Sequence, residues 1–574
     1  FLLLERVRRL MTERKLSYYE AREVVKASSV FTTHSPVEAA NERFDEGLMK
    51  HYFSESVAAL GASWDMFWEL GRDVPGDNRP FLMTILAFKL TSFANGVSRL
   101  HGEVARKMWR HAWPGFDETE IPIQSITNGI HVPSWIAPSM RSLFETRLGI
   151  NFHDRNCDDP GRWKKVGEIP DDLLWRTRME LKRGMIEFLR ERMTESFERE
   201  GLSPKLIKRK IDSLDPDALV IGFGRRFAAY KRAALAFNDP DRLSAILRNE
   251  ERPVQIVFAG KAHPNDGEGN GILKQIYSWS MDERFIDRVF FLENYDIRTA
   301  RAMVQGVDVW LNNPLRPMEA SGTSGMKVVI NGGLNFSVLD GWWDEAYDGE
   351  NGWAIGGGKE YASRETQDLA DSGDLYRVLE EEIVPKFYTR AENGVPERWV
   401  RMIKNSVGTL LPRFSALRMV REYLEKMYVP GARRSVRLNA EDYAGAKALA
   451  DWKAKITSRF ATVRILSFRA RGLRGDSMKS GEEFHVDASL SAGRLTKDEI
   501  RVELVVATID DANRPVNPEI IPMTRVAGSN GEGVVRYSGS YRATRAGRFI
   551  YGVRVLPSHP DLVRYQELGL VHWG

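Results

Sequence analysis

Cysteine is nearly absent from this sequence. The chain has one cysteine, Cys157, in 574 residues. A single cysteine excludes any disulfide within the chain and is typical of a reducing compartment. The sequence also lacks an apolar run long enough to cross a bilayer. We therefore expect a cytoplasmic protein with no membrane partner.

Charge of one sign is not in excess either. The 83 Lys and Arg residues nearly balance the 79 Asp and Glu residues, which leaves a formal net charge of +4 at pH 7. This balance gives no reason to expect a nucleic-acid partner, so a basic site would have to be local. No group of His, Cys and Asp residues has the spacing of a metal site, and none is predicted.

The size of the chain predicts more than one core. A length of 574 residues, with 43% hydrophobic residues, indicates a globular protein of two or three domains. The first residues, FLLLERVRRLM, lack an initiator Met and a small-residue cleavage site. They predict an amphipathic helix, and we expect the chain to be a fragment or processed form of a longer protein.

Short apolar runs alternate with helix-like stretches in the middle of the chain. A capping box at Ser17 and Glu20 starts a helix that should end near Lys26, before a short β-rich segment. Residues 38–112 are predicted to be mostly helical. From about Asp217 five runs follow: LVIGF, VQIVFAG, VFFLE, VDVWL and LNFSVLD. This pattern predicts a parallel sheet buried on both faces, with ligands beyond the carboxyl ends of its strands.

At the end of the chain, apolar residues recur at every second position, which is the period of a β-strand. A predicted helix, EDYAGAKALADWKAKITSRF, precedes alternating apolar residues from about residue 461. Examples are Val502, Leu504 and Val506. With turns such as AGSNGEG between such segments, the pattern predicts a small antiparallel β-sandwich.

Two motifs carry candidate chemistry. In IGFGRRFAAYKRA a strand predicted to end at Gly222 is followed by four cations. Arg226 and Lys231 are five residues apart, so they do not share one face of a regular helix, but they could converge on an anion. Arginine and lysine are the usual pair for phosphate. The alternative is a solvated basic face.

The second motif is EASGTSGMK, residues 319–327. Its glycines allow a ligand to approach the backbone, and its carboxylate and hydroxyls suit a polyol. Lys327 is a candidate for a Schiff base with pyridoxal phosphate, a common aldehyde cofactor. The alternative is a strand-to-helix turn whose lysine reaches water.

Single residues in loops are weaker signals. By themselves, His34 and Asn128 are more typical of a structural histidine and of a turn. Trp342 and Trp343 offer faces for sugar stacking, although core packing is the favoured role. The GEGNG segment at 267–271 misses the spacing of known phosphate loops and is not predicted to bind phosphate.

Together these motifs closely resemble the α-glucan phosphorylases, which degrade glycogen, starch and maltodextrin. In chain order they are FTTHSPVEA, TNGI, RRFAAYKR, FLENYDI and EASGTSGMKVVING. The resemblance extends to about Pro430, and the β-rich tail resembles the extra C-terminal domain of the shorter bacterial and archaeal branch. It implies a two-lobed α/β fold of the GT-B glycosyltransferase type, with Rossmann-like parallel sheets. The implied segments are 1–133 for the first lobe, 134–430 for the cofactor-binding lobe, 431–460 for a connecting helix and 461–574 for the sandwich.

The resemblance also implies a role for each matching residue. Lys327 matches the lysine that holds pyridoxal 5'-phosphate. Arg226 and Lys231 match the pair at the cofactor and substrate phosphates, with Arg225 beside them, and Thr323 and Tyr295 match the lining of the cofactor phosphate. Contacts to the sugar hydroxyls are implied for Tyr230, Glu319, Ser321 and Gly322. Asn128 and His34 match groups near the 6-hydroxyl and the reacting carbon of the sugar. The implied catalytic residues are Lys327, Arg226, Lys231 and His34.

The implied reaction is retaining phosphorolysis of an α-1,4-glucan by inorganic phosphate, which yields glucose 1-phosphate. In this family the cofactor phosphate acts as acid and base. The chain departs from the long animal and plant enzymes at Ala228-Ala229 and at Ser324-Gly325, which are not positions assigned to chemistry. The family's glycine loop should lie before residue 1.

Two other functions stay open from the sequence. A nucleotide-sugar glucosyltransferase, such as a glycogen synthase, would share the two-lobed architecture but would not need Lys327. An inactive glucan-binding fragment would keep the fold without catalysis. The sequence also leaves self-association of the chain open.

Overall fold

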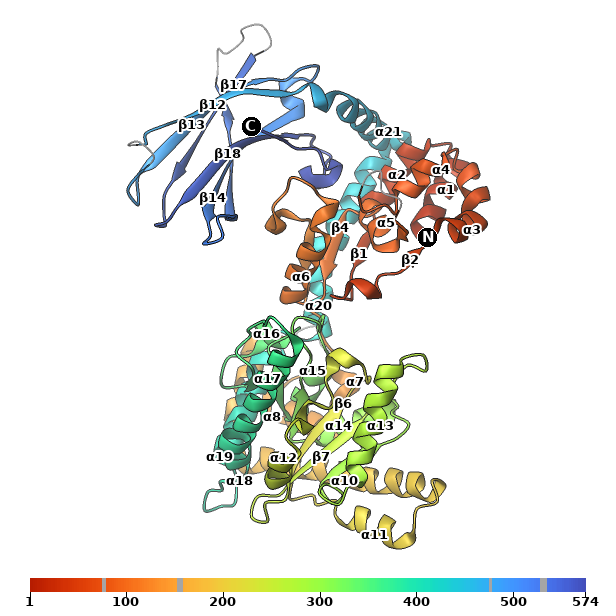
Figure 1. Ribbon diagram of the computed structural model, residues 1–574, viewed down its shortest axis with the longest axis vertical. Coiled ribbons are helices and arrows are strands. Elements are labelled where there is room, and N and C mark those ends of the chain that lie inside the picture. Colours follow the sequence, from red (N-terminus) through yellow and green to blue (C-terminus); the bar gives the residue numbers. More distant parts are fainter. Residues whose placement is uncertain (75–78, 152–157, 474–476, 527–533) are drawn as a thin grey trace.

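The computed structural model describes residues 1–574 except for 75–78, 152–157, 474–476 and 527–533, and it leaves out the side chain of Ala39. Cys157 and the predicted turn AGSNGEG at 527–533 lie outside the described residues. Figure 1 shows one large parallel-sheet region, a smaller helical region that carries both a short sheet and the N-terminus, and an all-β region at the far end. In the described ranges, no helix is both long enough and apolar enough to span a membrane.

The first region is mostly helical, as the sequence predicts. Its helices are α1 (Leu2–Arg14), α2 (Tyr18–Ala27), α3 (Glu46–Ala59), α4 (Trp64–Glu69), α5 (Met83–Lys89) and α6 (Arg99–Trp109). The predicted capping box at the start of α2 is confirmed, because the side chains of Ser17 and Glu20 each accept a hydrogen bond from the other residue's backbone N–H. A small parallel sheet has the order β1 (Val30–Thr32), β4 (Phe93–Gly96) and β5 (Ile123–Ser125), and β2 (Arg43–Phe44) pairs with β3 (Phe81–Leu82).

The second region contains the predicted parallel sheet. Its strand order is β11 (Gly352–Ile355), β10 (Leu334–Val338), β9 (Val309–Asn312), β6 (Leu219–Gly224), β7 (Val254–Ala259) and β8 (Val289–Leu292). The five apolar runs are confirmed as strands, and β6 continues two residues beyond the predicted end at Gly222. Strand β11 was missed because its four residues, GWAI, begin with a glycine and form no longer apolar run.

Helices cover both faces of this sheet (Figure 1). They are α7 (Val132–Trp135), α8 (Pro138–Leu148), α9 (Pro160–Lys164), α10 (Asp171–Arg199), α11 (Pro204–Asp212), α12 (Pro240–Leu247), α13 (Gly267–Met281), α14 (Ile297–Gly306), α15 (Ser324–Val329), α16 (Trp343–Ala346), α17 (Arg364–Val378), α18 (Val384–Tyr388) and α19 (Glu397–Leu410). The GEGNG segment opens α13 as ordinary helix. Trp342 and Trp343 are buried in the core, as the favoured prediction had it.

Two helices carry the chain back to the first region. These are α20 (Ala416–Tyr423) and α21 (Val429–Arg459), and α21 packs along α2. Residues 440–443 of α21 have non-helical backbone angles, so the helix is interrupted there. The Tyr423 hydroxyl of α20 accepts a hydrogen bond from the carboxamide of Asn95 at 2.9 Å and shares another with the Thr32 hydroxyl at 3.3 Å, which attaches α20 to the small sheet.

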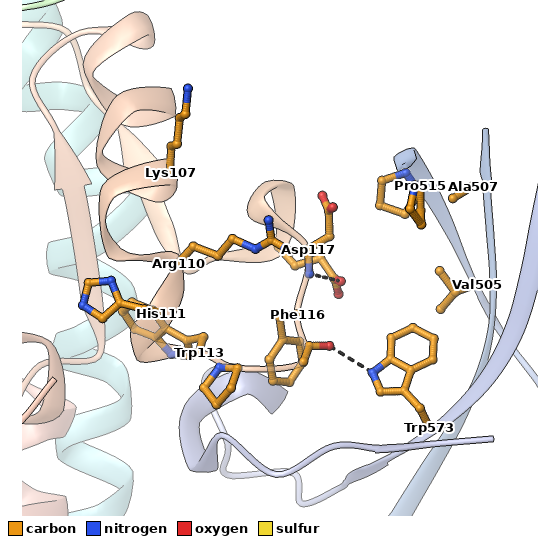
Figure 2. Close-up of a pocket in the computed structure, with 14 residues that line it drawn as sticks. Lys107, Arg110, His111, Trp113, Phe116, Asp117, Val505, Ala507, Pro515 and Trp573 are labelled. Atoms are coloured by element: carbon orange, nitrogen blue, oxygen red, sulfur yellow. Dashed lines mark hydrogen bonds between the residues drawn. The ribbon is translucent and has the colours of Figure 1, made fainter. Parts of the chain in front are cut away.

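The end of the chain forms two antiparallel four-stranded sheets that pack on a shared core, as predicted. One has the order β12 (Arg464–Arg471), β13 (Glu483–Ser491), β17 (Val534–Arg542) and β16 (Thr524–Arg525), and the other β15 (Pro515–Pro522), β14 (Ile500–Ile509), β18 (Phe549–Pro557) and β19 (His572–Trp573). The predicted alternation is incomplete in β14, where Val502 to Ala507 are all buried. Val505 and Ala507 of that run face the first region rather than the sandwich core (Figure 2).

A buried arginine joins the sandwich to the first region. Arg554 of β18 is fully buried and pairs with Glu120 at 2.5 Å and with Glu503 at 2.7 Å. Beside it the indole N–H of Trp573 donates to the carbonyl of Gly115 at 3.0 Å, along a cavity of about 690 Å³ (Figure 2).

Candidate active site

The carboxyl ends of the two parallel sheets meet. The strands β1, β4 and β5 lead into His34, Ser98 and Asn128, and the larger sheet leads into the loops that carry the two predicted motifs. The Ser98 hydroxyl donates to the carbonyl of Ala320 at 2.6 Å, and Thr127 donates to Glu345 at 2.7 Å. Ligands bind at this edge of parallel sheets, so the predicted site residues of both regions lie on the expected side.

Three charged side chains form a buried cluster at this edge. Arg225 follows β6, Lys231 lies in the short helical turn Ala229–Lys231, and Glu319 lies in the loop after β9. Oxygen Oε2 of Glu319 accepts from Arg225 Nη2 at 2.6 Å and from Lys231 Nζ at 2.9 Å. Each side chain is at most a tenth exposed. Two cations thus converge on a single carboxylate oxygen.

The cluster has two cations and one carboxylate, so its net charge is positive. Burial opposes the ionised form of Glu319, yet Arg225 and Lys231 hold its pKa at about 2. Burial, with Arg225 next in size, lowers the pKa of Lys231 to about 8. The buried Nη1 of Arg225 has no hydrogen-bond partner among the described residues. The site therefore keeps a free donor for one more anion.

The solvated-face interpretation of RRFAAYKR is wrong for three of its four cations. Arg225, Lys231 and Arg232 are buried, and Arg232 pairs with Asp368 and Asp371 at 2.7 Å each. Arg226 is exposed and lies near the Tyr230 hydroxyl. The amine that does reach Glu319 is Lys231, beside Arg225 rather than Arg226.

Lys327 lies in α15, in the loop-to-helix turn that follows β9. Its ammonium rests 4.0 Å from the centre of the Trp135 ring, and no described carboxylate pairs with it. Partial burial lowers the pKa of Lys327. An amine whose charged form is disfavoured is a better nucleophile towards an aldehyde than an ordinary surface lysine. Trp135 carried no signal in the sequence that connected it with Lys327.

At the end of β6, Gly224 leaves only enough space for the packed side chains of Trp310 and Tyr295. A Cβ atom on Gly224 would lie 2.7 Å from the Trp310 ring and 3.2 Å from the Tyr295 hydroxyl, so only glycine fits there. Trp310 donates to the Ser324 hydroxyl at 3.1 Å, which connects this space with the start of α15. Thr323 immediately precedes α15, and its carbonyl accepts from the Lys327 N–H at 3.3 Å. Tyr295 and Thr323 are thus at the same edge as Lys327.

Asp340, after β10, supports the loop that carries Glu319. Its carboxylate accepts from the backbone N–H groups of Glu319 at 2.9 Å and of Gly341 at 2.7 Å. Burial, together with the charge of Glu319, raises the pKa of Asp340 to about 7. In the same loop Gly322 has φ of 73°, which suits glycine, and the Ser321 carbonyl accepts from Trp342. Sequence reasoning missed Asp340, although it directly precedes the GWWDE segment.

The two candidates from the first region differ in how they are held. His34 is exposed, and no described residue is its hydrogen-bond partner. Behind it burial lowers the pKa of His101 to about 4, and His101 accepts from the Val97 N–H. The backbone of Asn128 is fixed by Val97 and Arg418, while its carboxamide bonds to none of the described residues. His34 and Asn128 are therefore available to a ligand.

Other kinds of site receive no support at this edge. Among the described residues, no group of three His, Cys, Asp or Glu side chains could hold a metal ion. Two cavities, of about 690 and about 600 Å³, lie between the first region and the C-terminal part of the chain, and none of the predicted site residues lines them.

Comparison with known families now identifies the class of protein. Residues 2–346 match the carbohydrate phosphorylase family, and residues 461–574 match the glycogen phosphorylase C-terminal domain. The chain belongs to the carbohydrate phosphorylase family.

Individual members of the family are similar to the chain over most of its length. The chain is 37% identical to a glycogen phosphorylase of Mycobacterium bovis over 100% of its own length, and 38% identical to a maltodextrin phosphorylase of Thermococcus litoralis over 98%. It is 40% identical to a glycogen phosphorylase of Aquifex aeolicus over 75% of its length. The chain spans 66%, 64% and 61% of the lengths of these relatives.

Proposed function

We propose that this protein is an α-1,4-glucan phosphorylase that releases glucose 1-phosphate from glycogen or maltodextrin with retention of configuration. The observation that carries the proposal is the convergence of Arg225 Nη2 and Lys231 Nζ on one buried oxygen, 2.6 and 2.9 Å away. With the unpartnered Nη1 of Arg225, this pair can bind a phosphate oxygen in the same way.

The residues at the edge fit pyridoxal 5'-phosphate. Lys327 offers an amine without a carboxylate partner among the described residues, and Arg225 offers an orphaned buried donor. Tyr295 and Thr323 lie at the same edge and are proposed as further lining residues. When bound, the cofactor would supply a second phosphate group as a proton donor and acceptor.

The cations of the chain have a clear electrostatic task in this reaction. Two phosphates and a departing glycosidic oxygen would concentrate negative charge beside side chains that are at most a tenth exposed. Arg225 and Lys231 are preorganised there, because Glu319 already holds them in position. Preorganised charge of this kind stabilises a transition state without reorganisation. Arg226, exposed beside Tyr230, is proposed to reach the substrate phosphate from the outer side.

The remaining candidates are proposed to bind the sugar. Glu319, Ser321 and Gly322 share one loop, and Tyr230 lies beside Lys231, whose ammonium is 4.7 Å from its ring centre. His34 and Asn128 approach from the opposing sheet and are free to contact the hydroxyl groups of the glucosyl unit. A sugar held from both regions would have one face directed at the attacking phosphate, which agrees with retention.

The fold type, the domain boundaries and the cellular location are proposals as well. We assign the two parallel sheets to the two lobes of a GT-B-type fold, with lobe boundaries near residues 133 and 430, a connecting helix to 460 and the sandwich after it. We also propose that the protein is located in the reducing cytoplasm. Self-association of the chain stays open, as it was from the sequence. The α21 helix, which packs on α2 and continues into the sandwich, supports a connecting role for that segment.

The test is to supply the protein, expressed from its full reading frame, with pyridoxal phosphate, maltodextrin and inorganic phosphate. We expect α-glucose 1-phosphate. Glucan elongation from a nucleotide sugar, with no use of phosphate, would favour the glucosyltransferase. Glucan binding without either reaction would favour the binding fragment.

A further inference from the structure

A second basic site lies in the first region, away from the candidate active site. It is the cavity of about 600 Å³ bounded by α2, α4, α5 and the C-terminal segment 563–569. This volume is within the range of small-molecule sites, about 300–1,000 Å³. The cavity shares no residue with the cluster around Glu319, so the inference stands apart from the proposed catalysis.

Every carboxylate that lines this cavity has an ion pair with a cation, although Oε2 of Glu567 has no hydrogen-bond partner among the described residues. Glu69 pairs with Arg72. Asp73 lies 3.4 Å from both Arg79 and His111. Glu567 is shared by Lys26 at 2.9 Å and Lys453 at 2.5 Å.

Three further cations of the cavity have no carboxylate partner among the described residues. Arg22 lies near the Tyr18 phenol, and its buried Nε has no hydrogen-bond partner. Lys89 donates only to the backbone carbonyls of Glu69 and Arg72. Arg564 is partly buried, and none of the described carboxylates forms an ion pair with it. Burial, which is the largest effect, and the charge of Arg22 lower the pKa of Lys89 to about 8, although Glu69 and Asp73 raise it. The lining holds five Lys and Arg residues and three carboxylates, so positive charge is in excess and an anion would offset it.

The shape and charge together select the kind of anion. Ile85, Phe88 and Trp113 give the cavity an apolar wall beside its cations. A phosphate monoester carries a charge of about −1.5 to −2, more than a single carboxylate, and suits the guanidinium fork. We propose that this cavity binds a small organic phosphate, with the phosphate among Arg22, Lys89 and Arg564 and a ring or other apolar body against Phe88.

Binding is measured by calorimetric titration, with phenyl phosphate as the probe and phenol as its uncharged counterpart. All measurements are made in a Lys231→Met background, which removes one cation of the proposed catalytic phosphate site. We expect binding of one phenyl phosphate per chain, weaker binding of inorganic phosphate, and no binding of phenol. Arg22→Met and Arg564→Met should each weaken phenyl phosphate at least tenfold, whereas Lys15→Met, an exposed cation outside the cavity, should leave it unchanged.

Thermal melts accompany the titrations. Phenyl phosphate should raise the Tm of the background protein but not that of the two arginine variants. Equal affinity in the arginine variants, or no binding in the background protein, would overturn the proposal. Failure of both arginine variants to fold would do so as well, because these side chains would then hold the structure rather than a ligand.

Discussion

At the scale of single residues, the site depends on how burial changes charge. Lys231 and Glu319 share a hydrogen bond. Burial lowers the pKa of Lys231 to about 8, whereas Arg225 and Lys231 together outweigh burial and hold the pKa of Glu319 at about 2. Lys231 therefore loses its positive charge as the pH rises through its pKa of about 8, whereas Glu319 keeps its negative charge. Around neutral pH both are charged, which is the state that binds an anion.

The first prediction concerns the pH dependence of phosphate binding. The charge of Lys231 is present below about pH 8 and is lost above it, while inorganic phosphate remains a dianion. We expect the KM for phosphate to rise roughly ten- to a hundredfold above that pH, because one charge-assisted hydrogen bond contributes about 1.5–3 kcal/mol. Lys231→Arg keeps its charge and should flatten the profile. The same alkaline rise in that variant would contradict the assignment.

The second prediction concerns Lys327 without cofactor. Its ammonium is partly buried over Trp135, with no described carboxylate to compensate it. Lys327→Met should therefore leave the Tm of the cofactor-free protein unchanged or higher, while it abolishes the absorbance gained on adding pyridoxal phosphate. Lys15→Met is the control and should change neither. A large drop in the Tm of Lys327→Met would indicate a structural lysine instead.

At the scale of elements, buried ion pairs attach helices to the large sheet. Lys182 and Arg178 of α10 reach Asp308, at the start of β9, at 2.6 and 3.9 Å. All three side chains are almost fully buried. Both cations also donate to backbone carbonyls, as Lys182 does to Ala218. The position of α10 on the sheet is thus fixed by charge as well as by apolar packing.

The third prediction removes the charge of Asp308. Asp308→Asn keeps the shape but leaves two buried cations uncompensated, which should cost about 3–5 kcal/mol. The Tm should fall by about 2–4 °C for each kcal/mol. Asp212→Asn is the matched control, because its pair with Lys208 is largely exposed and should contribute under about 1 kcal/mol. Equal shifts in the two variants would show that the buried pair has no special role.

Local patterns in the sequence predicted most elements but only part of the site. The capping box of α2 and five strands of the parallel sheet follow from spacing and apolar runs, which are local. The pairing of Arg225 with Glu319 joins residues 94 apart in sequence, so it depends on the order of β6 and β9 in the sheet. Trp135 and Asp340 were missed for the same reason, because their roles come from tertiary contacts.

At the scale of the whole molecule, the sandwich is fixed to the first region through a buried group of charged side chains and an exposed hydrogen bond beside it. Arg554 is the centre of this seam, with Glu120 on one side and Glu503 on the other. Trp573 adds a hydrogen bond to Gly115 beside it (Figure 2).

The fourth prediction tests this seam. Arg554→Met leaves the carboxylates of Glu120 and Glu503 without their main partner, so the contact should loosen. Backbone hydrogen exchange should increase in segments 113–121 and 572–574, and remain unchanged in the large parallel sheet. Arg545→Met, which breaks an exposed pair with Glu519, is the control and should change neither segment. Unchanged exchange at the seam in Arg554→Met would contradict its role.

One measurement tests the central claim, that the joined carboxyl ends of the two sheets form a cofactor-dependent phosphorolysis site. The protein from the full reading frame is loaded with pyridoxal phosphate, reduced with borohydride and mapped by peptide mass. The account predicts a single pyridoxyl adduct, on Lys327, and none in Lys327→Met. An adduct on another lysine, or none in active protein, would contradict it.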